Sequence, residues 1–417
     1  MTNLWVIGGG VESIPGLVVA KNMGLTVILS DINPEAPGIS YSDYFFKADT
    51  YSASENLRCM KEFIQKGHKI DGIIALAADV PETLAATSTH FGNVGQSIDT
   101  ATRVSNKYLM KQVLRKSGIS VPDFWKIDSV ESLSPKLLAG KRYVIKPVDS
   151  RGARGVLLID SSTNLEWAYE ESIKYSPSSS LILEEFLDGP QISTESLIQD
   201  GEFYHVGFAD RNYDKLEMFF PNIIEDGGSQ PSILGPNVRK SVFEMAGKAG
   251  SALGLKTGVL KGDMVWHQDK PYVIEVATRL SGGWFSSIQI PHSTNVNFVE
   301  LAIRQSLGED IRVFFNKKVR YAPVASRYVF IDHGVLLPEP NEVDLPKSKN
   351  NILIKLLYNK SMVSEQITKH NQRIGIVIAK GSTRKRAIKN ADKQIRKLSY
   401  LLRGSTQNQQ PVKIKEV

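Results

Sequence analysis

The strongest constraint on the fold is the alternation of apolar strands and helical stretches at the start of the chain. Residues 4–7 are apolar, three glycines follow at positions 8–10, and apolar runs recur at 26–29 and 72–76 with helical stretches between them. Strands that alternate with helices in this way predict an open parallel sheet. We therefore expect an α/β domain with a parallel sheet over residues 1–104.

The glycine turn leaves two interpretations open. Gly8 and Asp31 stand where the dinucleotide-binding pattern G-x-G-x-x-G has its first glycine and its acid, but Ser13 stands at the third glycine position. The turn is either a ligand site or a place where glycine lets a strand and a helix pack closely. In a nicotinamide-dependent dehydrogenase this segment would hold the cofactor, and the motifs described below would have no purpose.

Composition narrows the class of protein. The chain has 417 residues, enough for two or three domains, and with 41% hydrophobic and 23% charged residues it is not a disordered, collagen-like or coiled-coil chain. No apolar run approaches the roughly 20 residues that cross a bilayer, and residues 1–10 lack the charged start of a signal peptide. We expect a cytoplasmic protein without a membrane partner. The single cysteine, Cys59, excludes intramolecular disulfides and cysteine-cluster metal sites.

A second kind of pattern begins near residue 105. A helical stretch is followed by short strands that glycine and proline turns separate. We expect a second domain over residues 105–312 and a small α+β module over residues 313–417. Residues 383–403 hold eight basic residues and one acid, which accounts for the whole net charge of +7, and their apolar residues recur at spacings of three and four. This pattern predicts an amphipathic helix whose basic face is solvated, so we expect no nucleic-acid partner.

Two lysines and a glycine-rich loop suit the binding of a triphosphate. Lys107 begins a predicted helix and Lys146 ends a predicted strand, so two flexible cations can be aimed at phosphate oxygens. Residues 149–156, D-S-R-G-A-R-G-V, follow directly, and Gly152 and Gly155 free backbone N–H groups to turn toward an anion. Taken alone, each lysine is more often a surface charge, and the loop is more often a plain hairpin.

Two acidic segments complete the pattern. Residues 181–190, L-I-L-E-E-F-L-D-G-P, form an apolar strand that runs into acids, which suits an adenine slot. Asp263 and Glu275 come close across a predicted hairpin, where a divalent cation would relieve their repulsion. Arg279 leaves the second strand of this hairpin. With the N–H groups of residues 281–283 it can hold an acyl-phosphate or a carboxylate.

In this order, these segments resemble the ATP-grasp superfamily, in the style of carboxylate-amine ligases, biotin carboxylase and the purine-pathway members. The resemblance covers about residues 6–307, and the order of five motifs is more specific than any one of them. It implies an α/β and α+β fold with a Rossmann-like pre-ATP-grasp domain at residues 1–104. A two-lobed ATP-grasp domain follows at 105–312, with a mobile lid lobe at about 115–190, and then the module at 313–417.

The resemblance also implies which residues bind ligands, namely ATP with Mg²⁺ or Mn²⁺. Asp263 and Glu275 would ligate the metal, and Arg279 and Lys261 would be catalytic. The nucleotide contacts would come from Lys107, Lys146, Ser150, Gly152, Ala153, Gly155, Glu184, Glu185, Phe186, Leu187 and Gln191. Two positions depart from the family's pattern: Ala277 replaces an asparagine near the metal, and Gln191 replaces the ribose-binding glutamate.

The favoured function is that of an ATP-dependent ligase, which activates a carboxylate as an acyl-phosphate and joins it to an amine with release of ADP and phosphate. Carboxylation of an amine through carboxyphosphate and a non-catalytic, ATP-binding regulatory role stay open. The partners would be small-molecule carboxylate and amine substrates, and a homodimer is left open. The acceptor pocket is expected within residues 207–234, which include Asp210, Arg211, Glu225 and Asp226.

Overall fold

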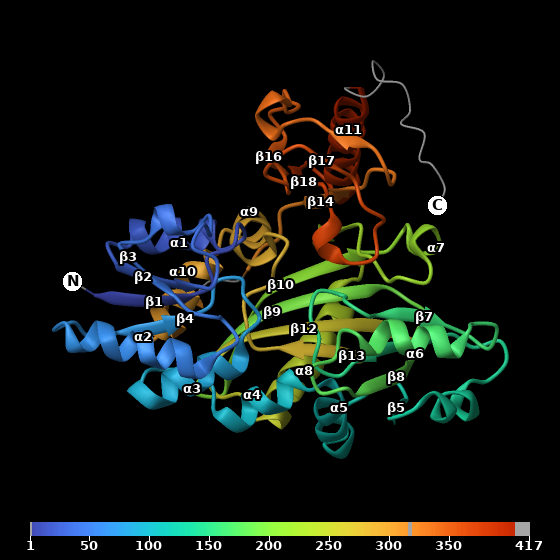
Figure 1. Cartoon of the computed structure of the whole chain (residues 1–417), viewed down its shortest axis with the longest axis horizontal. Helices are drawn as coiled ribbons and strands as arrows, with labels where there is room; N and C mark the ends of the chain where they lie inside the picture. The colour runs from blue at the N-terminus through green and yellow to red at the C-terminus, as the bar shows by residue number, and fades with distance from the viewer. Residues whose placement is uncertain (1, 316–318, 405–417) are drawn as a thin grey trace, which may run out of the picture.

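The computed structural model describes residues 2–315 and 319–404, whose strands form four sheets. Residues 1, 316–318 and 405–417, which belong to the predicted first and last domains, lie outside this description. Figure 1 shows an N-terminal layer of sheet and helices in blue, a long central sheet in green and yellow, a smaller lobe at the lower right and a C-terminal part in orange and red.

The N-terminal sheet is parallel, with the strand order β3-β2-β1-β4. Its strands are β1 (Asn3–Ile7), β2 (Thr26–Asp31), β3 (Tyr44–Lys47) and β4 (Gly72–Ile74), and its helices are α1 (Ile14–Asn22), α2 (Ala53–Gln65), α3 (Pro81–Phe91) and α4 (Ile98–Ser105). Leu4 and Val6 of β1 pack in one core with Leu17, whereas Trp5 packs in a second core with Phe63. Because alternate residues of one strand are buried on opposite faces, helices cover the sheet on both sides. The predicted fold class is confirmed.

The glycine turn after β1 is closed by its own acid. The Gly9 N–H donates to Asp31 Oδ2 at 2.7 Å, and the Asn33 N–H donates to Asp31 Oδ1 at 2.9 Å. A Cβ on Gly9 would lie 2.8 Å from a methyl group of Leu29, so the close packing itself requires glycine. Asp31 is therefore engaged inside the turn, which supports the packing interpretation over a ribose-binding role.

A four-stranded antiparallel sheet forms the smaller lobe, which we call the lid lobe. Its strands stand in the order β5-β8-β6-β7. They are β5 (Phe124–Ile127), β6 (Tyr143–Pro147), β7 (Leu157–Ile159) and β8 (Leu181–Glu185), with α6 (Leu165–Ile173) packed on them and α5 (Lys107–Lys116) leading into the lobe. The lobe has a hydrophobic core of its own around Tyr143 and Leu183.

The central sheet has eight strands in the order β13-β12-β9-β10-β11-β14-β18-β16, and neighbouring strands are antiparallel. They are β9 (Gln191–Gln199), β10 (Glu202–Asn212), β11 (Gly227–Gln230), β12 (Gly258–His267), β13 (Lys270–Ala277), β14 (Val324–Val329), β16 (Asn351–Leu356) and β18 (Gly375–Lys380). Further helices are α7 (Leu216–Phe219), α8 (Pro236–Leu253), α9 (Ile290–Thr294), α10 (Phe298–Ser306) and α11 (Arg384–Gly404), and β15 (Leu336–Leu337) pairs with β17 (Met362–Val363). The strands of the C-terminal part thus continue the central sheet.

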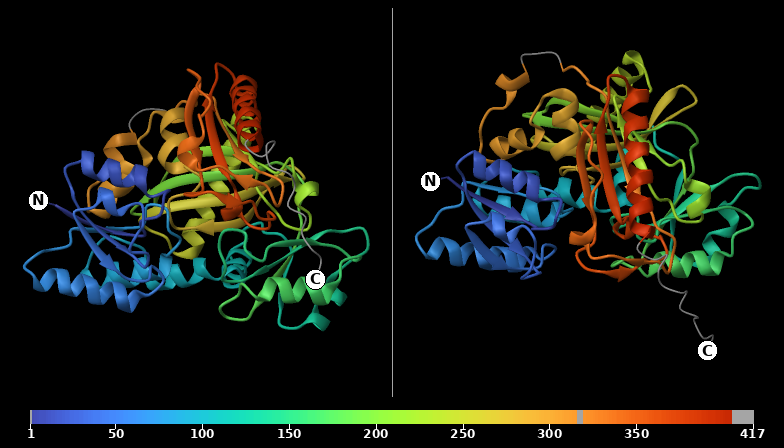
Figure 2. Two further views of the ribbon diagram at one scale, coloured as in Figure 1. Left: turned by 45° about the horizontal axis from the view of Figure 1, so that its top comes forward. Right: turned by 90° about the horizontal axis from the view of Figure 1, so that it is seen from above.

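The predicted basic helix is α11, which lies along the C-terminal strands (Figure 2). Ala387, Ala391 and Leu398 are buried, and the basic face is largely exposed. Arg384, at the start of the helix, is partly buried and forms an ion pair with Asp210 of β10. Within the part of the chain that the structure describes, no helix has both the length and the apolar character needed to cross a membrane.

The helix α8 has no counterpart among the expected elements. It begins at Pro236, a residue suited to the first helical turn, and ends at Gly254, whose φ is +90°. Its interior contains Gly247 and Gly250, which lower helix propensity. A Cβ on Gly250 would lie 3.2 Å from the ring of Phe203, so tertiary packing explains a glycine that weakens the local signal.

Candidate active site

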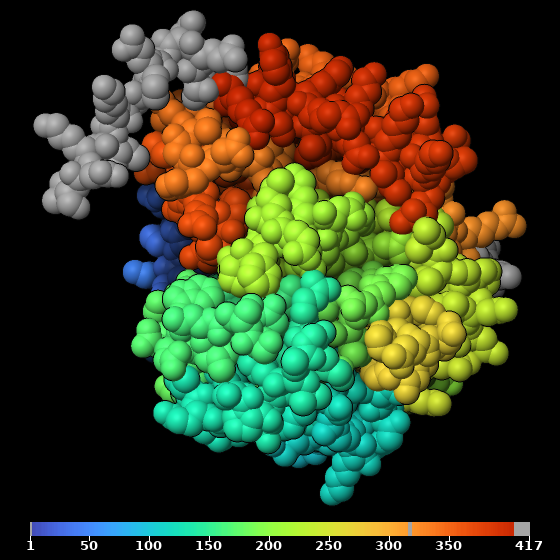
Figure 3. All heavy atoms as spheres, turned by 90° about the vertical axis from the view of Figure 1, so that its right-hand side faces the viewer, coloured from blue at the N-terminus to red at the C-terminus, as the bar shows by residue number. Residues whose placement is uncertain are grey.

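A cavity of about 390 Å³ opens where the lid lobe meets the central sheet. The predicted site residues that line it are Lys107, Lys146, Ser150, Gly152, Ala153, Glu184, Glu185, Phe186, Leu187, Gln191, Lys261, Asp263, Glu275 and Arg279. Eight basic and six acidic side chains line the cavity, so its walls carry an excess of positive charge, as a triphosphate site requires. Figure 3 shows the lid lobe in teal and green packed against the segment around α7 and the C-terminal part. The closure includes a bond from the Leu158 N–H to the Pro221 carbonyl at 2.7 Å.

The lysines come from two elements, as predicted. Lys107 starts α5, donates to the carbonyl of Ser150 at 2.7 Å and lies 3.3 Å from Glu275 Oε1. Lys146 is in β6, and its Nζ lies 3.0 Å from Glu184 Oε1. Glu184 is 2% exposed, and although burial opposes its ionisation, Lys111 and Lys146 lower its pKa. The side chain of Glu184 therefore contacts lysines, while Glu185 pairs with Lys141 at 2.7 Å.

The glycine-rich loop has the left-handed backbone conformation that glycine favours. Gly152, Ala153 and Gly155 all have positive φ, between +60° and +68°. An alanine in this region is strained, which is common at ligand sites. Gly155 does not line the cavity, and a Cβ there would lie 2.9 Å from the Ser172 carbonyl. The close approach of the loop to α6 therefore requires glycine at position 155, and a nucleotide contact of Gly155 stays a prediction.

The two predicted metal carboxylates lie side by side. Asp263 of β12 and Glu275 of β13 are paired in register. Asp263 Oδ2 lies 2.6 Å from Lys261 Nζ and 3.1 Å from Arg211, and these cations outweigh burial and lower the Asp263 pKa to about 2. Its second oxygen, Oδ1, is buried without a hydrogen-bond partner among the described residues.

This pair fits a divalent cation that is shared with phosphates. In residues 2–315 and 319–404, no three His, Cys, Asp or Glu side chains gather into a metal site of their own. Mg²⁺ bound to a nucleotide needs one or two protein carboxylates, because phosphates and water complete its coordination. Asp263, which is ionised at neutral pH and has one oxygen without a hydrogen-bond partner among the described residues, and the adjacent Glu275 meet that need. Ala277 lines the cavity and brings no side-chain oxygen to it.

Arg279 has a partner that the sequence did not indicate. Its Nε lies 3.3 Å from Oδ2 of Asp79, and Arg151 of the glycine-rich loop lies 3.8 Å from the other oxygen of Asp79. The prediction that the N–H groups of residues 281–283 bind an anion is wrong for two of these three groups. The Ser281 N–H donates to Glu195 at 2.8 Å, and the Gly283 N–H donates to Glu12 at 2.9 Å.

The expected acceptor segment is only partly at the cavity. Arg211 lines it and pairs with Glu225 at 2.9 Å. Asp210 pairs with Arg384 and bonds Ser232, and the Asp226 carboxylate accepts the Lys215 N–H, so these two acids serve the packing of the sheet.

His370, from the C-terminal part, lines the cavity beside this segment. Its backbone N–H contacts the Gly152 carbonyl at 3.5 Å, and its Nε2 accepts the Glu225 N–H at 3.4 Å. Burial, followed by Arg373, Arg211 and Lys261, lowers its pKa well below the ordinary value. The imidazole is therefore neutral, and because Nε2 accepts a hydrogen bond, the ring proton is on Nδ1.

Two residues of the site that were not predicted, Asp79 and Lys111, stand at positions from which they could have been predicted. Asp79 follows the strand at the carboxyl edge of a parallel sheet, where ligand-binding residues gather. Lys111 stands four residues after Lys107 and therefore on the same face of α5. His370 left no local signal, because only the chain's return to the central sheet brings it to the cavity.

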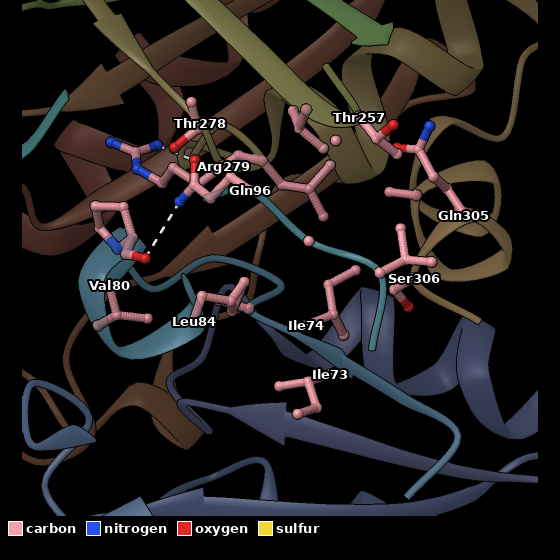
Figure 4. Close-up of a pocket in the computed structure, with 18 of the residues that line it drawn as sticks. Ile73, Ile74, Val80, Leu84, Gln96, Thr257, Thr278, Arg279, Gln305 and Ser306 are labelled. Atoms are coloured by element: carbon pink, nitrogen blue, oxygen red, sulfur yellow. Dashed lines mark hydrogen bonds between the residues drawn. The ribbon is translucent and has the colours of Figure 1, made fainter. Parts of the chain in front are cut away.

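A second, smaller cavity of about 70 Å³ lies between the N-terminal sheet and the central sheet, and Arg279 contributes to its wall as well. Figure 4 shows Ile74, Val80 and Leu84 around it, with Gln96 donating to the Pro81 carbonyl at 3.2 Å. Its volume holds no nucleotide, so the larger cavity is the candidate active site.

Residues 104–283 match the model of the ATP-grasp domain. The chain therefore contains an ATP-grasp domain, which confirms the family predicted from the sequence.

The individual relatives are distant. A D-alanine–D-alanine ligase of Coprothermobacter proteolyticus is 26% identical over 45% of this chain and 63% of its own length, and an L-arginine-specific L-amino acid ligase of Bacillus subtilis is 24% identical over 66% and 67%. The chain thus spans about two thirds or less of these curated relatives. The crystal structure of an L-amino acid ligase from Bacillus licheniformis superimposes with a TM-score of 0.78 at 19% identity, covering 95% of this chain and 97% of that one, which shows a shared fold.

Proposed function

We propose that this protein is an ATP-dependent carboxylate-amine ligase. ATP phosphorylates a carboxylate to an acyl-phosphate, and an amine then attacks the acyl carbon to form an amide or peptide bond, with ADP and phosphate released. The observation that carries this proposal is the Asp263 and Glu275 pair, which shares one cavity with Lys107 and Lys146. Such a cavity acts by positioning and by neutralising charge, so it needs no nucleophilic side chain.

The lysines and the lid lobe would hold ATP. Lys107 and Lys146 neutralise phosphate oxygens, the loop with Ser150, Gly152 and Ala153 covers them, and the residues from Glu184 to Leu187 border the adenine. Arg142 lies 4.6 Å from the ring of Phe186, which stiffens that border. Gln191 would hydrogen-bond the ribose.

Asp263 and Glu275 would hold Mg²⁺ or Mn²⁺, which when bound neutralises the charge of the transferred phosphoryl group. Lys261 keeps Asp263 ionised and would contact the phosphates as well. Arg279, held by Asp79, would place the carboxylate or the acyl-phosphate through its planar fork. Arg211 and His370 border the remaining space, where the amine substrate would lie.

Two relatives support amino acids as the first substrates to test, because their names are those of an L-amino acid ligase and a D-alanine–D-alanine ligase. ADP formation is measured with each of the twenty L-amino acids and hydroxylamine, which traps an acyl-phosphate as a hydroxamate, and then with pairs of amino acids. Hydroxamate formed only with ATP and a carboxylate supports the proposal. ADP formed with bicarbonate and an amine instead indicates carboxylation through carboxyphosphate, and ATP binding without turnover for any substrate indicates a regulatory protein.

We further propose that residues 1–104, 105–312 and 313–417 act as the pre-ATP-grasp domain, the ATP-grasp domain with its lid at about 115–190, and a C-terminal module that contributes His370 to the site. A cytoplasmic location and small-molecule substrates accord with this function. A homodimer stays a prediction, and size-exclusion chromatography with light scattering tests it.

A further inference from the structure

Lys111 is a fully buried cation directly beneath the nucleotide region. It lies on α5, and its side chain is 0% exposed. Its Nζ lies 3.3 Å from Glu184 Oε2 and donates to the Val273 carbonyl at 3.1 Å. The other oxygen of Glu184 lies 3.0 Å from Lys146. One buried carboxylate therefore stands between two lysines, and we call these three side chains the Lys–Glu–Lys cluster.

The cluster carries a net positive charge in a place that water hardly reaches. Burial lowers the pKa of Lys111 to about 8 against the pull of Glu184, so the ammonium is charged at pH 7. A carboxylate with a single lysine would be neutral, whereas this cluster has a charge of +1. A buried charge without a counterion is costly, and an anion from outside relieves that cost.

Lys146 is the lysine through which this charge reaches the cavity. Lys146 lines the cavity, whereas Lys111 lies behind Glu184 and does not. With Lys111 absent, Glu184 would be balanced by Lys146 alone, and the attraction of Lys146 for a second anion would be reduced.

We infer that Lys111 is a positioning residue for nucleotide binding: by occupying one oxygen of Glu184, it leaves Lys146 a surplus of positive charge for the phosphates of ATP. The inference rests on the proposed nucleotide site and not on the identity of the carboxylate or the amine.

A purely structural role for Lys111 makes a different prediction. Methionine has a volume similar to that of lysine, and in Lys111→Met the buried Glu184 keeps its ion pair with Lys146, so no charge is left unpaired and the variant is expected to fold. If Lys111 only fills space, this variant binds ATP as the parent does. If Lys111 sets the charge of the cluster, removal of the opposing carboxylate as well, in Lys111→Met/Glu184→Gln, frees Lys146 again and restores its attraction for the phosphates.

The experiment measures the dissociation constants of ATP with Mg²⁺ and of adenosine by isothermal titration calorimetry at pH 7. Lys111→Met should bind ATP about tenfold more weakly, the effect of weakening one hydrogen bond to a charged group. Adenosine, which lacks phosphates, should bind unchanged. Because Glu184 also borders the proposed adenine site, the double variant is judged by its ratio of ATP to adenosine affinity, which should recover to within about threefold of the parent's. Lys116→Met, an exposed lysine on the same helix, is the matched control.

Three results would overturn the inference: unchanged ATP affinity in Lys111→Met, equal losses for ATP and adenosine, or a double variant whose ratio of ATP to adenosine affinity does not recover. If Lys111→Met does not fold, Lys111→Gln, which is polar and uncharged, gives the same test. Absence of ATP binding by the parent would reject the proposed function together with the inference, whereas normal binding by every variant rejects the inference alone.

Discussion

The cavity contains two groups of charged side chains that arise in different ways. The lysine group, Lys107, Lys146 and Glu184, comes from three elements of one stretch of the chain, α5, β6 and β8. The arginine group, Arg211 and Arg279 with Asp79 and His370, joins separate strands of the central sheet to the N-terminal layer and to the C-terminal part.

The different origins of the two groups suggest different ligands: the lysine group would bind ATP, and the arginine group would bind the substrates that are particular to this protein. ATP is the same molecule in every ATP-dependent enzyme, so its binding residues can be held in a compact series of local motifs. The second substrate differs between enzymes, and its contacts come from whatever segments reach the cavity. The variants below test whether the two groups act on different ligands, in order of the expected effect.

Glu275→Gln should have the largest effect, because Glu275 lies where the two groups meet. It is paired with Asp263 and lies 3.3 Å from Lys107. Loss of its charge weakens both metal binding and the lysine contact, and turnover should fall on the order of a hundredfold or more. Magnesium titrations of ADP formation measure the loss, with the exposed Glu166→Gln as control. Parental activity at ordinary magnesium would refute the metal assignment.

Arg279→Lys should separate the two groups. Lysine keeps the charge but loses the bidentate fork, so kcat/KM for carboxylate-dependent ADP formation should fall by about 1.5–3 kcal/mol. ATP affinity should stay nearly normal. Equal losses in both measurements would assign Arg279 to the nucleotide, and no loss in either would leave it as a structural partner of Asp79.

His370→Gln should have a smaller effect, confined to the amine. The neutral ring has its proton on Nδ1, which can donate to an anionic group of the substrate. Glutamine keeps a donor but displaces it, so KM for the amine should rise about fivefold. Trapping with hydroxylamine, which needs no amine substrate, should proceed at the parental rate. A slower trapping reaction would instead place His370 in the activation step.

Most of what the sequence predicted is local, and most of what it missed is not. The hairpin that pairs Asp263 with Glu275 follows from two apolar strands and a tight turn, and the parallel N-terminal sheet follows from alternation of strand and helix. The partner of Arg279 is 200 positions earlier in the chain, at Asp79, and only the packing of two domains brings them together. A single sequence contains no record of such a pairing.

The N–H groups of residues 281–283 are a second case in which a contact with a distant residue could not be predicted from the sequence. Their glycine-rich sequence is compatible with an anion site, and the local pattern predicts one. The structure instead supplies two internal acids, Glu12 and Glu195, which accept these donors. The N–H donors of a turn that looks suited to a ligand can therefore be occupied by an acidic side chain from another element.

Glu195 leads to the last prediction, a dependence of stability on pH that originates beneath the arginine group. It is 0% exposed in β9, and its Oε1 accepts the Ser281 N–H at 2.8 Å and the Ser286 hydroxyl at 2.5 Å. Burial raises its pKa to about 7, against the opposing effects of these hydrogen bonds and of Lys261 and Arg279.

Because the folded-state pKa of Glu195 lies above the ordinary value of 4.5, the folded protein holds a proton that the unfolded chain releases. The resulting stability is complete below pH 4.5 and is lost as the pH rises through about 7. Between pH 5 and pH 8 the free energy of unfolding should fall on the order of 2 kcal/mol from this group. Glu195→Gln, which cannot ionise, should remove that slope and be more stable relative to the parent at pH 8 than at pH 5. Urea unfolding at both pH values measures this, with the exposed Glu244→Gln as control. Parallel pH profiles for the parent and Glu195→Gln would show that Glu195 stays ionised throughout, and the turn that carries Arg279 would then rest on a fixed charge.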